Sequence, residues 1–199
     1  MDYEERVGHD ARMTREPRFP VLNSTDMTPQ QRAVAAEIAA GPRGEVRGPF
    51  LALIHNPELA RRVQSLGEHL RWGGKLPAHL KELAVLVTAR RWTCQHEWLM
   101  HAKLAREVGL DERIVASIAE GREASRMSGD EAAVYAFCRE AHATGRVGDD
   151  AFLSIRKRFG LEGVLELLAL CGYYSMMAMV LNTAGMPLPE NASPPLEPL

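Results

Sequence analysis

Four side chains that can exchange protons lie close together in the middle of the chain. Cys94, Glu97 and His101 are spaced at i, i+3 and i+7, and this spacing places them on one face of an α-helix. Glu82 lies twelve residues before Cys94, on the helix expected to precede it. A thiol, two carboxylates and an imidazole differ widely in pKa, so in apolar surroundings they can support acid–base chemistry.

His101 is the predicted general acid and base, because an imidazole titrates near neutral pH. Glu97, one helical turn earlier, has two interpretations: it orients the ring or shares its proton, or the two residues form an ion pair on the helix surface. Cys94 has two interpretations: the dipole of a helix N-terminus favours its thiolate and makes it reactive, or it is a small apolar residue in the wall of the site. A metal held by Cys94, Glu97 and His101 is geometrically feasible, but we predict no metal.

Four further residues, Trp98, His55, Tyr173 and Asn182, are candidate substrate contacts. The alternative for Trp98 is a place in the core, and for His55 a place in a surface loop. Tyr173 and Asn182 lie in an apolar stretch, where buried polar groups need hydrogen-bond partners, so their alternative role is structural. Basic residues that can bind a substrate carboxylate are not ranked by the sequence. They are Arg71, Arg90, Arg91 and Lys75.

Helical periodicity runs along the whole chain, and no segment alternates between apolar and polar residues over the length of a strand. Thr28 is a predicted N-cap, Thr93 can cap the helix that starts at Cys94, and Ser128 forms a capping box with Glu131. We therefore predict an all-α fold of about eight helices. The predicted helices cover residues 30–40, 57–72, 77–91, 94–108, 111–120, 129–144, 149–159 and 161–184.

The 199 residues fit a single domain. We divide them into an N-terminal arm (1–27), a helical domain (28–186) and a Pro-rich extended tail (187–199). The net charge of −2 gives no basic surface of the kind that binds nucleic acid or an anionic membrane. Neither partner is therefore expected.

Residues 165–181 form the longest apolar segment. Polar side chains interrupt it, so it is predicted to be a buried helix and not a membrane span. The first 20 residues are charged and lack the apolar core of a secretory signal. Three widely spaced cysteines do not form a disulfide framework. These features predict a cytoplasmic protein.

The central stretch resembles the motif of the carboxymuconolactone decarboxylase and AhpD-like superfamily. That motif is Glu, eleven residues, Cys-x-x-Cys, three residues and His. Glu82, Cys94 and His101 match it, and Glu97 stands in place of the second cysteine. Leu76-Pro77 before the motif and Val108-Gly109-Leu110 after it also fit. Residues 170–182 and Pro187-Leu188-Pro189 resemble the decarboxylase-like branch, so the resemblance covers residues 45–190.

The resemblance implies an AhpD-like helical fold assembled as a homo-oligomer, a trimer or hexamer, with active sites near subunit contacts. The peroxidase branch needs two thiols one helical turn apart, because one attacks the peroxide and the other resolves the sulfenic acid. Glu97 cannot do the latter. We therefore predict a cofactor-free lyase, similar to a carboxymuconolactone decarboxylase, that moves protons on a small organic acid or lactone through Glu82, Glu97 and His101.

Two alternatives stay open. The first is a thiol-dependent peroxidase in which Cys94 works with an external thiol. The second is a catalytically inactive member of the superfamily that serves as a binding or assembly subunit. An intact set of three titratable groups favours the enzyme over the inactive subunit.

Overall fold

The computed structural model describes residues 17–124, 126–186, 188 and 192–198. All regular structure within these ranges is helical, which confirms the predicted fold class. The helices are α1 (Pro29–Ala40), α2 (Phe50–Leu53), α3 (Pro57–Trp72), α4 (Ala78–Arg91), α5 (Gln95–Glu107), α6 (Glu112–Ala119), α7 (Gly129–Thr144) and α8 (Asp149–Ala184).

Two elements differ from the predicted set of helices. The segment after residue 49 forms the one-turn helix α2, which the periodicity did not predict because four residues are too few to show a helical period. The last two predicted helices together form α8, and they meet at a kink at Gly160, where φ is 70° and ψ is −175°. A glycine adopts this conformation without steric cost. The predicted boundary at residue 160 therefore marks a bend within α8.

Two of the predicted helix starts are confirmed in atomic detail. The hydroxyl of Thr28 accepts a hydrogen bond from the backbone N–H of Gln31, and the Gln31 side chain accepts one from the Thr28 N–H. Ser128 and Glu131 make the same reciprocal pair at the start of α7. Both capping boxes satisfy backbone donors that a helix N-terminus otherwise leaves unpaired.

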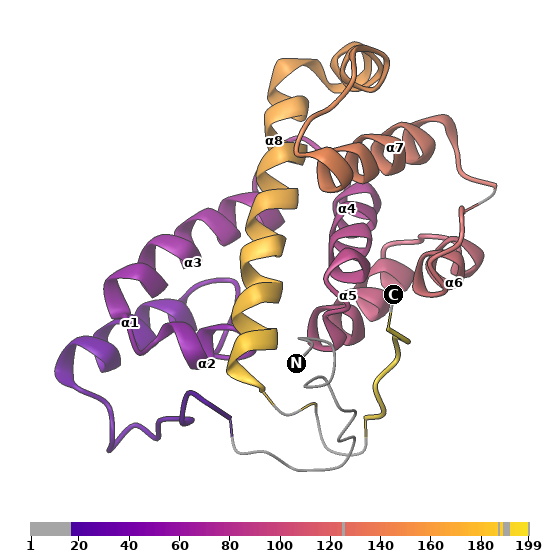
Figure 1. The fold of residues 1–199 in the computed structure, drawn as a ribbon. Coiled ribbons are helices and arrows are strands. Elements are labelled where there is room, and N and C mark those ends of the chain that lie inside the picture. Colours follow the sequence, from indigo (N-terminus) through magenta and orange to yellow (C-terminus); the bar gives the residue numbers. More distant parts are fainter. Residues whose placement is uncertain (1–16, 125, 187, 189–191, 199) are drawn as a thin grey trace, which may run out of the picture.

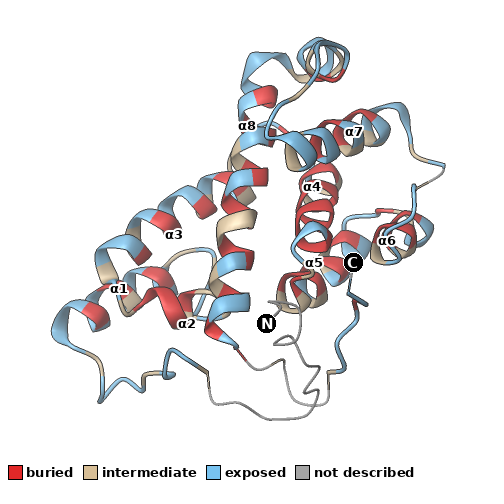
Figure 2. Ribbon diagram, in the orientation of Figure 1, coloured by how far each residue is buried: buried red, intermediate tan, exposed pale blue. Residues whose placement is uncertain are grey.

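α8 runs through the middle of the molecule and separates two groups of helices (Figure 1). α1 to α3 lie on one side and α4 to α7 on the other, and α2, α3, α4 and α7 all contact α8. α4 is enclosed on every side, since each residue from Leu83 to Arg90 is buried (Figure 2). Packing on all faces fixes both the position and the rotation of α4.

A buried ion pair fixes the start of α4 against α8. Lys81 Nζ lies 3.2 Å from Glu166 Oε1, and both side chains are less than a tenth exposed. Glu166 Oε2 also accepts hydrogen bonds from the backbone N–H groups of Lys75 (2.9 Å) and Leu76 (3.4 Å). Gly74 has a φ of 71°, and a Cβ there would lie 2.1 Å from Glu166 Oε1. Glu166 therefore determines where α4 begins.

Much of the predicted arm and tail lies outside the described residues. That is the case for residues 1–16 of the arm and for residues 187, 189–191 and 199 of the tail. In the described part of the arm, the Arg18 N–H donates to the Ala184 carbonyl at 2.8 Å. In the tail, the backbone of Leu196 exchanges two hydrogen bonds with the Gln95 side chain. The division into arm, domain and tail stays a prediction.

α8 is long and apolar enough to cross a membrane by length and composition, and no other helix in the described ranges is. More than half of its most apolar window, 56%, is buried against the rest of the protein. Such burial is typical of a core helix. The cytoplasmic location predicted from the sequence stays a prediction.

Lys81→Ala is expected to lower the free energy of unfolding by about 3 to 5 kcal/mol, because it leaves the Glu166 carboxylate buried without its cation. Lys75→Ala is the matched control. Its ion pair with Glu162 is exposed on both sides, so its loss should cost much less than the loss of the buried pair. Urea unfolding followed by circular dichroism measures both variants. Equal losses would contradict a structural role for the buried pair.

Candidate functional site

His101 lies between two carboxylates that come from two different helices. Its Nδ1 donates to Glu82 Oε2 of α4 at 2.7 Å, and its Nε2 lies 3.2 Å from Glu97 Oε2, one turn earlier on α5. The imidazole is 4% exposed. The three residues predicted to form a relay are therefore in contact, with the histidine in the middle and a carboxylate at each nitrogen.

The tight connection between α4 and α5 makes this contact possible. Thr93 adopts a φ of 44°, and the N–H of Cys94 donates to the carbonyl of Ala89 at 2.9 Å, so the chain reverses within three residues after α4. The predicted N-cap was wrong by one position, because Cys94 and not Thr93 precedes the first residue of α5. The reversal packs α5 against α4 and brings His101 beside Glu82.

The two carboxylates keep His101 protonated at neutral pH. Burial by itself lowers the pKa of an imidazole, since it disfavours the charged form. Here the charge of Glu82, its hydrogen bond to Nδ1, and the hydrogen bond and charge of Glu97 outweigh burial and raise the pKa of His101 from 6.5 to about 9. The site therefore holds an imidazolium next to two acceptors.

A cavity of about 350 Å³ adjoins this relay. Residues of α3, α5 and α8 and of the loop before α2 line it. His101 and Glu97 both belong to the lining, whereas Glu82 does not. Glu82 therefore acts behind the histidine, and Glu97 and His101 are the members of the relay that a small molecule can reach.

Two tyrosines of α8 form part of the same lining. Tyr174 meets the His101 ring edge-on at 4.9 Å between centroids, and Tyr173 meets Tyr174 edge-on at 5.2 Å. The Tyr173 hydroxyl is buried and has no partner among the described residues, while burial raises its pKa to about 12. It is therefore a protonated hydroxyl buried against α3. Gly67 admits it, since a Cβ there would lie 2.1 Å from the hydroxyl oxygen.

Besides the His101 imidazolium, four arginine and lysine side chains line the cavity, and the sequence singled out just one of them, Arg71. Arg43, Arg47 and Lys103 were missed. The local signal for the first two is the repeated Arg-Gly pair at 43–44 and 47–48, whose glycines have φ values of 77° and 58°. Arg43 is held in place by a hydrogen bond from its Nε to Gln64 (2.7 Å) and by the face of the Phe50 ring at 4.4 Å.

Cys94 precedes the first residue of α5 as its N-cap. Its backbone is extended there, with φ −84° and ψ 98°. The thiol is fully buried in a cluster with Ala52 and Ala178 and is absent from the cavity lining. Burial raises its pKa to about 12. These facts favour the apolar wall over the reactive thiol.

Of the predicted substrate contacts, Tyr173 alone lines the cavity. Trp98 is 4% exposed and packs in the main core. His55 bonds the carbonyl of Pro20 through Nε2 at 2.9 Å. Asn182 donates to the carbonyl of Trp92 at 3.0 Å, which is the structural alternative. Within the described residues, no group of three or more His, Cys, Asp or Glu side chains is arranged to hold a metal ion.

Comparison with known proteins agrees with the motif. Residues 57–140 match the model of the carboxymuconolactone decarboxylase family, and this segment contains Glu82, Cys94, Glu97 and His101. The crystal structure of an uncharacterized peroxidase-related protein with an alkylhydroperoxidase AhpD core, from Ralstonia eutropha JMP134, superposes with a TM-score of 0.71. The predicted resemblance to this superfamily is confirmed.

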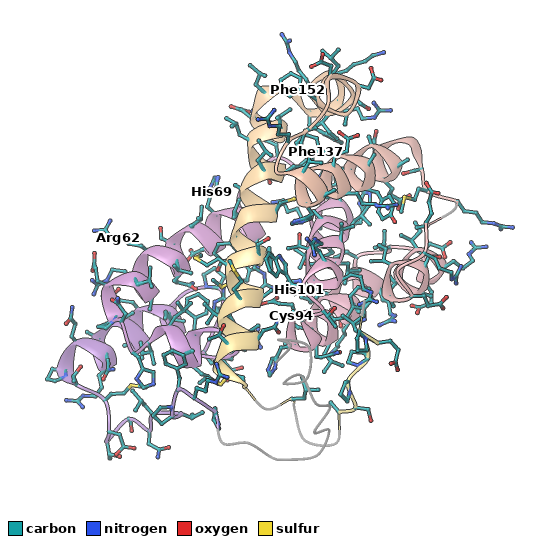
Figure 3. The ribbon with its side chains drawn as sticks, viewed as in Figure 1. Arg62, His69, Cys94, His101, Phe137 and Phe152 are labelled. Atoms are coloured by element: carbon teal, nitrogen blue, oxygen red, sulfur yellow. The ribbon has the colours of Figure 1, made fainter. Side chains whose placement is uncertain are left out.

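The superposition extends over most of both chains, although their sequence identity is low. The two proteins are 20% identical, and the alignment covers 88% of this chain and 93% of the other. At this identity the likeness establishes the AhpD-like fold alone. No curated protein matches the chain in sequence. Figure 3 shows His101 and Cys94 near α8, and His101 contacts Tyr174 of that helix. The departure from the motif is at Glu97, between these two residues in the sequence.

His101 is expected to titrate near pH 9. Glu82→Gln should lower this pKa, because the Glu82 charge makes the largest contribution to raising it. Because the folded-state pKa exceeds the unfolded value of 6.5, the relay stabilises the fold fully below pH 6.5. About 3 kcal/mol of this stabilisation should be lost as the pH rises through 9. Nuclear magnetic resonance of the imidazole and denaturation at several pH values measure both effects.

A His101 that titrates near 6.5 in the folded wild type would contradict the two charge-assisted contacts. Glu82→Gln provides the control for the stability measurement, because it should show a smaller loss between pH 6.5 and 9 than the wild type.

Proposed function

We propose that this chain is a lyase similar to carboxymuconolactone decarboxylases, which acts on a small organic acid or lactone by proton transfer. The observation that carries the proposal is the buried imidazolium of His101, held by Glu82 and Glu97 at the edge of a cavity. A charged acid of this kind, fixed in a site of limited water access, is suited to deliver a proton to carbon.

The charges around the cavity support an anionic substrate. Arg43, Arg47, Arg71 and Lys103 line it, and Glu97 is the one carboxylate in the lining. Guanidinium groups bind carboxylates with two parallel hydrogen bonds. An organic acid therefore has a place for its carboxylate beside the proton donor His101.

The proposed chemistry uses the proton on His101. Decarboxylation breaks the bond between the carboxylate carbon and its neighbour, and the electron pair remains on the substrate as an enolate. The carboxylate carbon leaves as CO2. His101 then gives a proton to the enolate carbon, directly from Nε2 or through Glu97, and becomes neutral. Glu82 stabilises the imidazolium before transfer and holds the ring in orientation. Solvent returns the proton for the next turnover.

The position of Cys94 argues against the peroxidase alternative. A peroxidatic cysteine must be a thiolate that the peroxide can reach, and the thiol of Cys94 is fully buried with its pKa raised to about 12. The inactive-subunit alternative gives no reason for a histidine to stay charged in a buried place, where burial of an ion has a substantial energetic cost.

We further propose that the chain forms a homo-oligomer, a trimer or hexamer. Leu161, Leu165 and Leu168 are spaced at i, i+4 and i+7 on α8 and are 56%, 65% and 43% exposed. This spacing forms an apolar stripe on one face of the helix, and such stripes mark protein contacts when they remain uncovered. The stripe offers a second copy of α8 a complementary apolar surface.

Turnover of carboxymuconolactone, and in a parallel assay of an organic hydroperoxide with a dithiol, tests the proposed reaction. His101→Gln and Glu82→Gln should lower kcat for the lactone by at least about 100-fold, because each removes the charged proton donor or its support. Arg71→Gln should mainly raise KM, by about tenfold. Cys94→Ala is the control and should leave kcat for the lactone unchanged.

Peroxide consumption that disappears in a Cys94→Ser variant would overturn the proposal in favour of the peroxidase. Lactone turnover at the wild-type rate in His101→Gln would refute the relay itself. Circular dichroism of each variant separates loss of chemistry from loss of fold.

Leu165→Glu should lower the oligomer mass to that of the monomer, because it buries a carboxylate in the apolar contact. Leu153→Glu, on the other side of the Gly160 kink, is the matched control for the same change on the same helix. Light scattering after size-exclusion chromatography measures the masses. A wild type that is already monomeric would disprove the proposed assembly.

A further inference from the structure

A second cavity, distinct from the first, lies beside the C-terminal end of α4. Its volume is about 270 Å³, and residues of α4, α6, α7 and the chain after α6 line it. It has no lining residue in common with the cavity at His101. The lining contains five basic side chains and no carboxylate. They are Arg90, Arg91, Arg122, Arg139 and His142.

Arg90 is the central feature of this cavity. It is 6% exposed, and its Nε has no hydrogen-bond partner among the described residues. Its Nη1 makes one long bond, 3.3 Å, to the hydroxyl of Thr93. Buried polar groups are nearly always paired, and a guanidinium carries five donors. A ligand that supplies acceptor oxygens would complete this residue.

The charges of the cavity are largely uncompensated by the protein. Within the described ranges, no carboxylate oxygen lies within 4.0 Å of the guanidinium nitrogens of Arg90, Arg91 or Arg139, whereas Arg122 pairs with Glu120. Arg139 stacks on Tyr135, with 5.5 Å from its guanidinium carbon to the ring centroid. Such stacking limits the freedom of the guanidinium and prepares it for binding.

His142 links the wall of the cavity to the core. Thr88 donates its hydroxyl proton to the carbonyl of Ala84 at 2.8 Å. The 2.8 Å contact between Thr88 and His142 Nε2 therefore has the Nε2–H as donor. The imidazole is fixed in one orientation. Four of the five basic side chains, all except Arg122, stand on the helices α4 and α7.

We propose that this cavity binds a small oxyanion, the carboxylate of an organic acid or a phosphate. Arg90, Arg91 and Arg139 have no carboxylate partner among the described residues. Their guanidiniums match the acceptor oxygens of either group. The volume lies just below the range of about 300 to 1,000 Å³ that drug-sized ligands occupy, so the ligand is small. Val87 and Ile118 in the lining leave room for an apolar part. The site is independent of the proposed reaction at His101.

Isothermal titration calorimetry with sodium phosphate and with benzoate tests this site. The titrations use the Arg71→Gln protein, so that anion binding at the first cavity is weakened. In that background, Arg91→Gln with Arg139→Gln should raise Kd by about tenfold or more, because two charge-assisted hydrogen bonds are lost. Both residues are exposed, so the fold should be retained, and circular dichroism checks this.

Arg146→Gln with Arg156→Gln is the matched control, with the same change in charge at exposed positions that line neither cavity. It should change Kd by less than about twofold, because distant surface charges contribute little. Tighter binding of benzoate identifies an organic acid as the ligand, and tighter binding of phosphate a phosphate. Absence of binding by both anions, or equal weakening in the control, would overturn the site.

Discussion

The proton on His101, shared with two carboxylates in a buried place, is the interaction on which the rest of the site depends. Burial disfavours an imidazolium, and Glu82 and Glu97 reverse that preference at the two ring nitrogens. One carboxylate comes from the same helix at i−4, so local geometry supplies it. The other comes from α4 and has to be delivered by the tertiary structure. The chain reversal at Thr93 and the enclosure of α4 place Glu82 beside His101.

α4 extends from the contact with His101 to the second cavity. Its first turns hold Lys81, which pairs with Glu166 of α8, and Glu82, which binds His101. Its last turn holds Arg90, in the second cavity. Because the residues between them are buried on all faces, the helix cannot shift at one end without repacking at the other. Burial of a polar residue at either end of an enclosed helix destabilises the fold unless the residue has a hydrogen-bond partner. Among the described residues, Arg90 bonds Thr93 through Nη1 and has no partner for its Nε.

The replacement of one motif cysteine by Glu97 changes what the superfamily site can do. A thiol in that position would make a dithiol with Cys94, whereas a carboxylate accepts a hydrogen bond from the histidine and holds a negative charge at the cavity. With that partner gone, Cys94 is packed among apolar side chains and its thiol stays protonated. The change removes the second thiol of a redox motif and places a carboxylate beside the histidine. The three arginines and one lysine around the cavity fit the proposed anionic substrate better than a neutral peroxide.

The sequence by itself determined the helical fold class, most helix boundaries, the cap at Thr28, the capping box at Ser128 and the residues of the cluster around His101. These features depend on residues within one turn of each other, or on a motif spacing that the superfamily shares. The sequence did not determine which side chains share the cavity. Arg43 and Arg47 stand in a loop with no period, and Cys94 is buried among residues of α2 and α8 and does not line the cavity. Trp98, His55 and Asn182 were assigned from residue type and position in the chain. In the structure Trp98 packs in the core, His55 bonds Pro20 and Asn182 bonds Trp92. Such contacts join residues far apart in the chain, so only the packing of α3, α5 and α8 around one another could decide them.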